Sequence, residues 1–343
     1  MNEGLVAKEL AACGMVPISI QPVGKGGSAR SFWRVQTSKH RRVIFISYDA
    51  NIRENTLYAG IAAFLAASGV SVPALLGDNP TGSYLILQDL GDDDLYTTRS
   101  HDSATRYRFY EQAITEIARL HCISLEHHQT TLPPLMPPFD EGLYRWEREY
   151  FWQYFFRVFV EGAAYRIPPP VEQELSLVAQ KLLLGRPVLI HRDLQSQNVM
   201  IQREKCYLID FQGLRLGNPL YDIASLLFDP YVEIAEDCRT NLLEYYLSLT
   251  DKRFPLHKET LLLAATQRLL QALGAYGFLS RERDKKHFLA YIPPAIKNLQ
   301  GVLKALACCP ALTKLIDGID KKRLQMQIDR HGQAMGFSAS LDN

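Results

Sequence analysis

The stretch Pro187–Ile201, PVLIHRDLQSQNVMI, cuts a hydrophobic run with charged and amide side chains. The apolar residues end at Ile190, a His-Arg-Asp triplet bounded by His191 and Asp193 follows at once, and Asn198 precedes the next apolar run. Unpaired polar groups are costly to bury, so a strand that served only a core would not contain them. We interpret the interruption as a loop that carries chemistry between two short buried strands.

A second acidic group follows Asp193 at a distance of 17 residues. There a strand that comes after the turn QREK ends in Asp210, the first residue of DFQG. Magnesium prefers hard oxygen ligands, and one carboxylate with one amide oxygen is a common protein contribution. We therefore assign Asp210 and Asn198 to metal binding, and we assign Asp193 to orienting a hydroxyl nucleophile and accepting its proton.

A glycine-rich turn, GKGGS, lies near the N-terminus and precedes a strand with aromatic residues. Gly24, Gly26, Gly27 and Ser28 would let backbone N–H groups approach phosphates without a clash from a Cβ atom. Such a turn is weak support by itself. Together with the two acidic motifs, it predicts phosphoryl transfer from ATP with Mg²⁺ as the cofactor.

Hydrophobic periodicity divides the chain near residue 91. The segment before it predicts a helix at 4–12 and a small, mostly antiparallel sheet with one further helix that ends at Gly69. The expected strands are 31–37, 41–49, 72–78 and 82–92, and the further helix is 53–70. The segment after it predicts helices at 103–125, 140–162, 171–184, 222–248, 258–279 and 288–306, with strands only around 187–211.

The composition excludes several classes of protein. Lys and Arg number 38 against 37 Asp and Glu, so the charge gives no support for a nucleic-acid or membrane partner. No uninterrupted apolar stretch is long enough to predict a membrane span, and the N-terminus does not have the pattern of a secretory signal. The six cysteines show no C-x-x-C spacing, which favours reduced thiols and a cytoplasmic location.

The motifs resemble the protein-kinase-like superfamily and, more narrowly, the aminoglycoside phosphotransferase and choline kinase-like family. The resemblance extends over about residues 24–303, and its most specific part is 187–231, with HRDLQSQNVMI and LIDFQGLRLGNPLYDIASLLFDPY. It implies an α+β, bilobal protein-kinase-like fold. Residues 1–91 would form a small antiparallel-sheet N-lobe that clamps the nucleotide, and residues 92–343 a larger, mainly helical C-lobe with the metal and acceptor sites.

The resemblance also implies roles for individual residues. His191 would be a structural member of the catalytic loop. Gln88, Asp89 and Leu90 would form the hinge whose backbone meets adenine. Asp222 would brace the catalytic loop from the start of a helix, where a carboxylate is also favoured by the helix dipole.

The chain departs from protein kinases in the strand VIFIS. A protein kinase has a Lys there that contacts the phosphates, whereas this chain has Ile46 followed by Ser47. Lys25 and Arg30 are the candidates to supply that charge. Glu54, at the position of the kinase glutamate that pairs with this Lys, is left without its expected partner.

The acceptor is predicted from charge and from the resemblance. Residues 250–343 contain fifteen Lys and Arg against eight Asp and Glu, which argues against a polycationic antibiotic. The chain resembles the amino sugar kinases of bacterial cell-wall recycling, which act on N-acetylmuramate and N-acetylglucosamine. Candidate acceptor contacts are Gln195 in the catalytic loop, Trp146 and Glu147 in an aromatic helical segment, and Arg268 in an apolar helix.

The sequence therefore predicts an ATP-dependent small-molecule kinase whose partner is a hydroxyl compound, with a sugar favoured and its anomeric hydroxyl as one candidate. We expect a monomer or a weak dimer. Alternatives are a kinase of the same fold that acts on choline, homoserine, methylthioribose or an aminoglycoside, and a nucleotide-binding pseudokinase. A protein kinase is disfavoured because no A-P-E-like segment follows DFQG.

Overall fold

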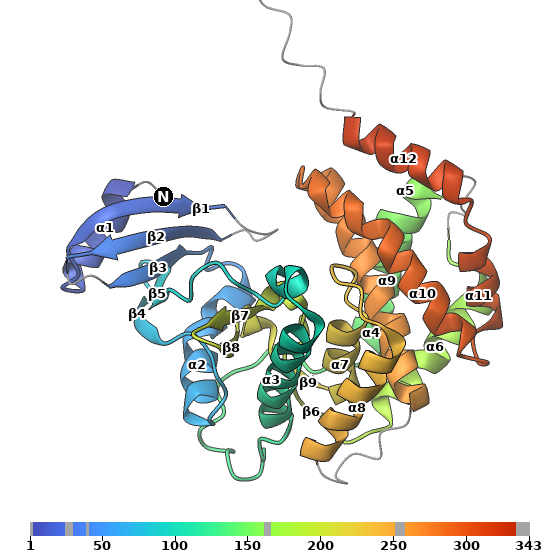
Figure 1. Ribbon diagram of the computed structural model, residues 1–343, viewed down its shortest axis with the longest axis horizontal. Coiled ribbons are helices and arrows are strands. Elements are labelled where there is room, and N and C mark those ends of the chain that lie inside the picture. Colours follow the sequence, from blue (N-terminus) through green and yellow to red (C-terminus); the bar gives the residue numbers. More distant parts are fainter. Residues whose placement is uncertain (1–2, 25–29, 39–40, 161–165, 251–257, 334–343) are drawn as a thin grey trace, which may run out of the picture. The chain divides into compact units, whose positions relative to one another are not determined.

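The structure is a computed structural model that describes residues 3–24, 30–38, 41–160, 166–250 and 258–333. Its internal contacts define two compact units (Figure 1). The first comprises residues 1–137, 188–216 and 240–251, and the second comprises 138–187, 217–239 and 252–343. The lobe boundary expected after residue 91 is a different division of the chain and stays a prediction.

The first unit combines a sheet with helices and a short hairpin. Its elements are α1 (Glu3–Ala12), β1 (Pro17–Val23), β2 (Ser31–Thr37), β3 (Arg42–Ser47), α2 (Arg53–Ala67), β4 (Leu75–Asn79), β5 (Tyr84–Gln88), η1 (Thr97–Ser100), α3 (Ser103–His121), β6 (Val188–Ile190), η3 (Ser196–Asn198), β7 (Val199–Gln202), β8 (Lys205–Leu208), η4 (Phe211–Gly213), β9 (Arg215–Gly217) and most of α8 (Glu236–Thr250).

The sheet has five strands in the order β1-β2-β3-β5-β4, and every neighbouring pair is antiparallel. This confirms the antiparallel N-terminal sheet of the predicted fold class. The strand β1 was not predicted. It contains Pro17 and Pro22, which weaken a strand pattern and are tolerated because β1 lies at the sheet edge.

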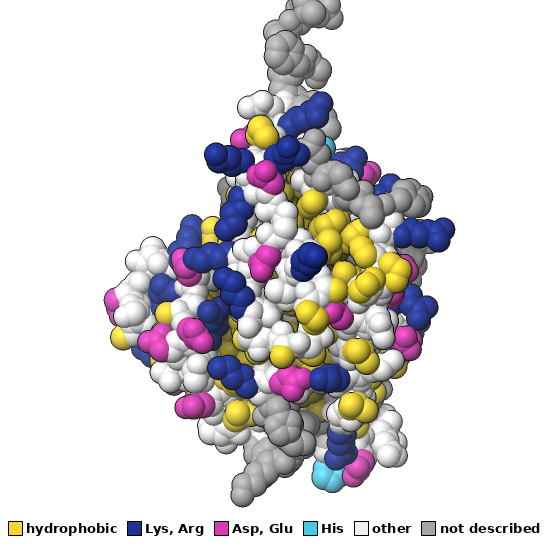
Figure 2. Space-filling view, turned by 90° about the vertical axis from the view of Figure 1, so that its right-hand side faces the viewer, with side chains coloured by type: hydrophobic (Ala, Val, Ile, Leu, Met, Phe, Trp, Pro, Cys, Tyr) yellow, Lys and Arg dark blue, Asp and Glu magenta, His cyan; other side chains and the backbone are white. Residues whose placement is uncertain are grey.

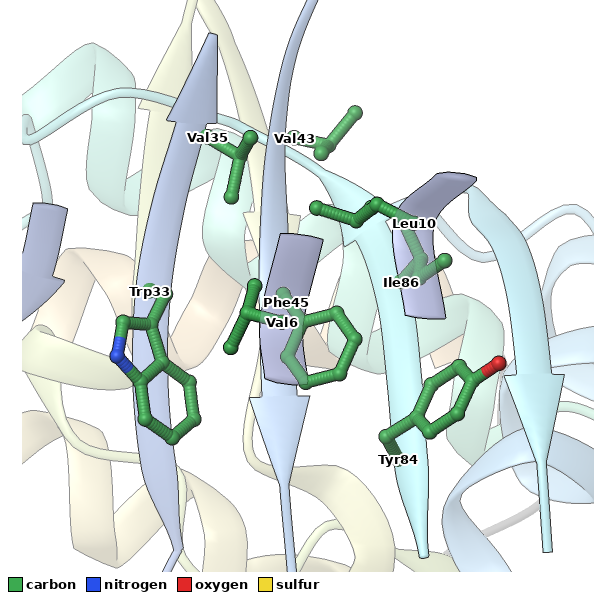
Figure 3. Close-up of a cluster of buried hydrophobic side chains, with 8 residues drawn as sticks. All are labelled: Val6, Leu10, Trp33, Val35, Val43, Phe45, Tyr84 and Ile86. Atoms are coloured by element: carbon green, nitrogen blue, oxygen red, sulfur yellow. The ribbon is translucent and has the colours of Figure 1, made fainter. Parts of the chain in front are cut away.

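One face of the sheet packs against α1, and Figure 3 shows the side chains that join them. Alternation along β2 buries Trp33 and Val35, while their neighbours on the strand are more exposed. Phe45 and Tyr84 stack with ring centroids 4.9 Å apart. The whole cluster comprises Val6, Leu10, Trp33, Val35, Val43, Phe45, Tyr84 and Ile86. Burying each of these large side chains contributes roughly 1.5–3 kcal/mol.

The helix α2 ends at a glycine, as predicted. Gly69 has φ +80°, a left-handed conformation that costs glycine little. Its N–H donates to the carbonyl of Ala66 at 3.1 Å, and the N–H of Val70 donates to the carbonyl of Leu65 at 3.0 Å. This is the Schellman pattern, which satisfies the last carbonyls of the helix.

The segment 187–211 forms the short strands that the sequence predicts. β7 and β8 pair as a hairpin whose turn residues, Arg203 and Glu204, have φ of 49° and 62°. Two consecutive positive φ values give the turn a twist that matches that of paired strands. β6 pairs with β9 in a separate two-stranded sheet.

The second unit is helical. Its elements are α4 (Glu141–Phe151), the π-helical turn η2 (Trp152–Phe156), α5 (Arg157–Phe159), α6 (Pro169–Leu183), α7 (Pro219–Leu227), α9 (Lys258–Glu282), η6 (Lys286–Tyr291), α10 (Ile292–Lys304), α11 (Pro310–Asp317) and α12 (Lys321–Gln333).

Two helix predictions need correction. The single helix expected at 222–248 is two helices, α7 and α8, with residues 228–235 between them. The helix expected at 140–162 is interrupted by the π-helical turn at Trp152–Phe156. That turn lies against α9, where a Cβ atom on Gly277 would stand 2.0 Å from the Tyr154 carbonyl oxygen. The helix periodicity of a sequence does not reveal such a local widening.

The surface is mixed in charge. On the face drawn in Figure 2, Lys and Arg side chains are spread widely, with Asp and Glu among them. Within the described parts of the chain, no helix combines the length and the apolar character that crossing a bilayer would need.

Candidate active site

His191 holds the start of the catalytic loop. It follows β6, is fully buried, and its Nε2 atom lies 2.9 Å from the carbonyl oxygen of Ile209. The backbone N–H of Asp193 points to its Nδ1 atom at 3.3 Å. A carbonyl oxygen only accepts and an N–H only donates, so the imidazole carries its proton on Nε2. His191 thus ties the loop to the residue before Asp210.

Asp193 lies in the loop between β6 and β7. The Gln195 side-chain amide donates to its carboxylate at 2.5 Å. Its backbone carbonyl accepts from the Gln195 N–H at 3.0 Å and from Asn198 Nδ2 at 2.8 Å. The loop is therefore closed around Asp193 by both amide side chains. Gln195, one of the candidate acceptor contacts, lies within reach of the candidate base.

Asn198 and Asp210 flank one hairpin, Asn198 directly before β7 and Asp210 two residues after the end of β8. The Asn198 carbonyl accepts from the N–H of Ile209 at 3.0 Å, which aligns the two chain segments. Since Asn198 donates through Nδ2 to the loop, its Oδ1 atom is the one suited to a metal ion. Asp210 adopts a left-handed conformation with φ 63°, uncommon for a residue other than glycine and frequent at functional sites.

The carboxylate of Asp210 is held by positive and amide groups. It forms an ion pair with Arg30, and Gln212 Nε2 donates to it at 3.1 Å. Burial alone would raise the pKa of Asp210, but the charge and hydrogen bond of Arg30 and the hydrogen bond of the Gln212 amide hold this pKa below its ordinary value. About one-third of the Asp210 side chain, 33%, stays exposed. The carboxylate is thus ionised and accessible.

The residues present fit a magnesium ion that arrives with a nucleotide. Across the described residues, no cluster of three or more His, Cys, Asp or Glu side chains forms a cation cage. Magnesium commonly takes only one or two protein ligands and completes its octahedron with phosphates and water. One carboxylate and one amide oxygen, from Asp210 and Asn198, match that demand, and the cationic Arg30 guanidinium already occupies the Asp210 carboxylate.

Position 46 of β3, where a protein kinase has its Lys, carries no cation, as the sequence indicates. Ile46 is buried, and it pairs with Phe32 on β2 and with Leu85 on β5. The nearest candidate from the sequence, Arg30, has a side chain that is only 8% exposed and lies 5.6 Å from the centre of the Phe32 ring. The structure therefore brings Arg30 to the carboxylate of Asp210, and Lys25 lies outside the described residues.

Glu54 has a partner that the sequence analysis missed. Arg215, buried on β9, directs Nη2 to the Glu54 carboxylate at 3.4 Å and donates through Nε to the carbonyl of Gly213 at 2.9 Å. In the same region Tyr58 of α2 stacks on Phe211, with centroids 4.7 Å apart. The DFQG turn is therefore fastened to α2. In the sequence, the only indication of this contact is that the charged Arg215 lies within the apolar segment LRLG.

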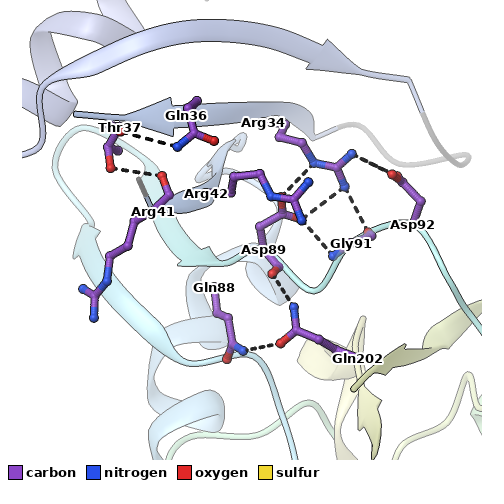
Figure 4. Close-up of polar contacts among 10 residues, drawn as sticks. All are labelled: Arg34, Gln36, Thr37, Arg41, Arg42, Gln88, Asp89, Gly91, Asp92 and Gln202. Atoms are coloured by element: carbon purple, nitrogen blue, oxygen red, sulfur yellow. Dashed lines mark hydrogen bonds and ion pairs between the residues drawn. The ribbon is translucent and has the colours of Figure 1, made fainter. Parts of the chain in front are cut away.

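The expected nucleotide contacts are described only in part. Gly24 follows β1, whereas Gly26, Gly27 and Ser28 lie outside the described residues. At the expected hinge, Gln88 ends β5, and both Asp89 and Leu90 are buried. Polar side chains surround this hinge (Figure 4).

The other predicted residues belong to the second unit. Asp222 lies fully buried in the first turn of α7. Trp146 is 46% exposed on α4 and stacks on Tyr150, with centroids 5.0 Å apart. Arg268 is buried on α9, where its Nε donates to the Ser225 hydroxyl at 2.9 Å and its Nη1 contacts Gln271.

Glu147 is fully buried on α4. Tyr221 donates its hydroxyl to Oε1 at 2.8 Å, and Gln267 Nε2 donates to Oε2 at 2.9 Å. This pattern is typical of a structural carboxylate. The predicted acceptor contact of Glu147 stays untested, and its burial gives that prediction no support.

Comparison with known proteins identifies the family. The model of the phosphotransferase enzyme family (APH) matches residues 19–256, which is more than half of the chain. The chain belongs to this family. The resemblance to aminoglycoside phosphotransferases is thereby confirmed, and the chain is a phosphotransferase that acts on hydroxyl groups.

Relatives agree with this assignment. The chain is 23% identical over 310 residues to N-acetylmuramate/N-acetylglucosamine kinase of Pseudomonas aeruginosa, covering 87% of each chain. Among solved structures, choline kinase LicA from Streptococcus pneumoniae has a TM-score of 0.60 at 14% identity, covering 87% of this chain and 99% of that one. ADP-bound aminoglycoside phosphotransferase APH(2'')-Ib has a TM-score of 0.58 at 11% identity, with 87% and 98% covered. These structural similarities confirm the protein-kinase-like α+β fold.

Proposed function

We propose that this phosphotransferase transfers the γ-phosphate of ATP to a hydroxyl of an amino sugar of the N-acetylmuramate or N-acetylglucosamine type. The observation that carries the proposal is the catalytic hairpin, where Asp193, Asn198 and Asp210 are fastened to one another through backbone contacts. A relative named as a kinase of these sugars aligns over most of the chain.

Asp193 acts on the acceptor. Its carboxylate orients the sugar hydroxyl toward the γ-phosphate and accepts its proton as the new bond forms. Gln195, which donates to this carboxylate at 2.5 Å, keeps it in one orientation and lies close enough to contact the acceptor as well. Positioning of this kind supplies most of the catalysis in phosphoryl transfer, because little covalent chemistry falls to the protein.

Asn198 Oδ1 and the Asp210 carboxylate would hold magnesium. The bound ion supplies charge neutralisation at the phosphates. Arg30 pairs with the Oδ1 atom of Asp210, and its guanidinium would supply toward the phosphates the positive charge that a strand Lys supplies in protein kinases.

The nucleotide would be held by residues of an N-lobe over 1–91. The Gly24–Ser28 turn covers the phosphates, and the backbone of Gln88, Asp89 and Leu90 meets the base. A C-lobe over 92–343 would supply the catalytic hairpin and the acceptor site, with Trp146, Arg268 and Glu147 as candidate contacts and Asp222 as a brace.

The acceptor is proposed from charge and relatedness. A region with an excess of Lys and Arg, residues 250–343, suits a neutral or anionic sugar better than a polycation. We propose a cytoplasmic enzyme that works as a monomer or weak dimer on this small molecule.

A coupled assay of ADP release tests the proposal. The wild-type protein with Mg²⁺ and ATP is offered N-acetylmuramate, N-acetylglucosamine, choline, homoserine, methylthioribose and kanamycin, and products are examined by phosphorus NMR. We expect turnover on an amino sugar and a new phosphomonoester signal, whose coupling shows whether the anomeric hydroxyl was used. Turnover confined to a different acceptor would replace the amino sugar, and ADP binding without release on any acceptor would indicate a pseudokinase.

A further inference from the structure

The carboxylate of Asp89 is the centre of an ionic network at the hinge (Figure 4). Its side chain is 1% exposed, and it lies 2.9 Å from Arg34 Nε and 3.6 Å from Arg42 Nε. Arg34 Nη2 and the N–H of Gly91 also donate to it, at 3.1 Å and 2.9 Å. Arg34 further binds the Gly91 carbonyl and the Asp92 carboxylate. The side chain of Asp89 is therefore committed to holding the hinge.

The backbone carbonyl of Asp89 is held from another element. Gln202 Nε2 donates to it at 2.8 Å. The Gln202 amide oxygen accepts from Gln88 Nε2, also at 2.8 Å, and Gln88 Oε1 accepts from the N–H of Ala74 at 3.2 Å. The Gln202 amide therefore contacts two adjacent hinge residues, Gln88 through its oxygen and Asp89 through its nitrogen.

These partners lead directly to the catalytic groups. Gln202 is the last residue of β7, the strand that begins immediately after Asn198. Along the same strand, the N–H of Ile201 donates to the Asp93 carbonyl at 2.8 Å, and the N–H of Leu95 donates to the Val199 carbonyl at 2.9 Å. The segment after the hinge is thus hydrogen-bonded along β7, and Gln202 extends this ladder to Asp89.

Arg34 connects the hinge in a similar way to the segment that contains Arg30, the partner of Asp210. It lies on β2, whose first residue follows Arg30. Within the first unit, Asp89 is therefore joined through Arg34 to the strand next to the Asp210 ion pair and through Gln202 to the strand next to Asn198.

We propose that Gln202 and Arg34 are positioning residues that clamp the hinge through Asp89, so that the base-binding backbone is held in register with the groups that bind phosphate and metal. This inference rests on the proposed use of ATP. A pre-formed hinge reduces the ordering cost of nucleotide binding. Without the clamp, the base would have to order the hinge as it binds.

The affinity for ADP in the presence of Mg²⁺, measured by isothermal titration calorimetry, tests the clamp without turnover. Gln202→Leu removes both amide contacts at similar volume, and we expect its Kd for ADP to rise roughly fivefold, as the loss of about one net hydrogen bond would give. Gln36→Leu is the matched control, because Gln36 lies half-buried on β2, the strand of Arg34, and donates to the neighbouring Thr37 carbonyl at 3.5 Å. Its Kd should stay within about twofold of wild type.

A merely structural role predicts something else: a lower melting temperature with an unchanged Kd, and that result would overturn the clamp. Gln202→Glu covers the case in which Gln202→Leu does not fold. The carboxylate can still accept from Gln88 but places a negative oxygen beside the Asp89 carbonyl in place of a donor, so we expect a loss of affinity at least as large as for Gln202→Leu, whereas wild-type affinity would contradict the proposal. Failure of the wild-type protein to bind ADP at all would refute the proposed kinase function instead.

Steady-state kinetics provide a second readout. With a productive acceptor, Gln202→Leu should raise the KM for ATP by about the same factor as the Kd, while kcat changes less. A fall in kcat by a similar factor, with no change in the KM for ATP, would show that Gln202 acts on the loop that carries Asp193 and not on the hinge. That result would contradict the clamp.

Discussion

Two groups of polar side chains interrupt hydrophobic segments of this chain, and they are satisfied in different ways. In the candidate catalytic hairpin, Asp210 keeps 33% of its side chain exposed, and the Arg30 guanidinium balances its charge. In the second unit, Glu147 is fully buried, and Tyr221 and Gln267 fill its two oxygens. The partly exposed Asp210 carboxylate can still meet a ligand. The full burial of Glu147 and its two hydrogen bonds favour a role in the fold.

The largest effect should come from removing the exposed carboxylate. Asp210→Asn keeps the size of the side chain but withdraws the negative charge from magnesium and from Arg30. We expect kcat/KM to fall on the order of 10³-fold while the melting temperature changes little. Activity within tenfold of wild type across a magnesium titration would mean that Asp210 does not hold the metal.

Among the substitutions that test the fold of the second unit, Gly277→Ala should lower the free energy of unfolding most. The added Cβ atom would stand 2.0 Å from the Tyr154 carbonyl oxygen, so helix α9 must move away from the π-helical turn. We expect a loss of at least about 3 kcal/mol in the free energy of unfolding, measured in urea.

Gly301→Ala is the matched control for this change. Gly301 lies in the exposed part of α10, and nothing stands within 4 Å of its added Cβ atom. The same substitution should therefore stabilise the protein, by about 0.5–1 kcal/mol. Equal effects at both positions would contradict the close approach at Gly277.

Tyr221→Phe tests the enclosed carboxylate directly. It deletes the hydrogen bond from Tyr221 to the buried Glu147 carboxylate, which should cost about 1.5–3 kcal/mol of stability. Turnover at a temperature where the variant is folded should stay close to wild type. A large loss of turnover at full stability would instead move Glu147 to the acceptor site.

The smallest effect is expected at Arg215, which is buried and pairs with the partly exposed Glu54. Arg215→Met removes the contact with Glu54, which is about one-third exposed, so its pairing energy is modest. We expect the KM for ATP to rise about three- to fivefold. Arg145→Met, which removes the exposed pair with Glu141, is the control and should leave that KM unchanged.

Much of the fold and of the catalytic hairpin is predictable from the sequence, because both depend on local patterns. Alternation identifies β2 and β3, a glycine marks the end of α2, and the spacing of Asp193, Asn198 and Asp210 follows from the loop and hairpin that carry them. Pairings that join distant segments are different. Arg215 with Glu54 and Gln202 with Asp89 are separated by more than a hundred residues, and no local pattern announces them.

The same reason limits the prediction of acceptor residues. The segment that contains Trp146 and Glu147 shows helical amphipathicity, which indicates a buried face but not which partners it meets. Only the arrangement of α4, α7 and α9 shows that Glu147 faces Tyr221 and Gln267 while Trp146 is exposed. A polar residue within an apolar pattern therefore marks a position with a specific role, but the pattern does not tell whether that role is in catalysis or in the fold.

The central claim is that Asp193 serves chemistry rather than binding or folding. The decisive measurement compares Asp193→Asn with the wild-type protein in two assays, ADP release with an amino sugar and ADP affinity with Mg²⁺. We predict that turnover falls by roughly 10²- to 10⁴-fold while the Kd for ADP stays within about twofold, because Asp193 is not proposed to touch the nucleotide before transfer. Turnover close to wild type in this variant would contradict the account.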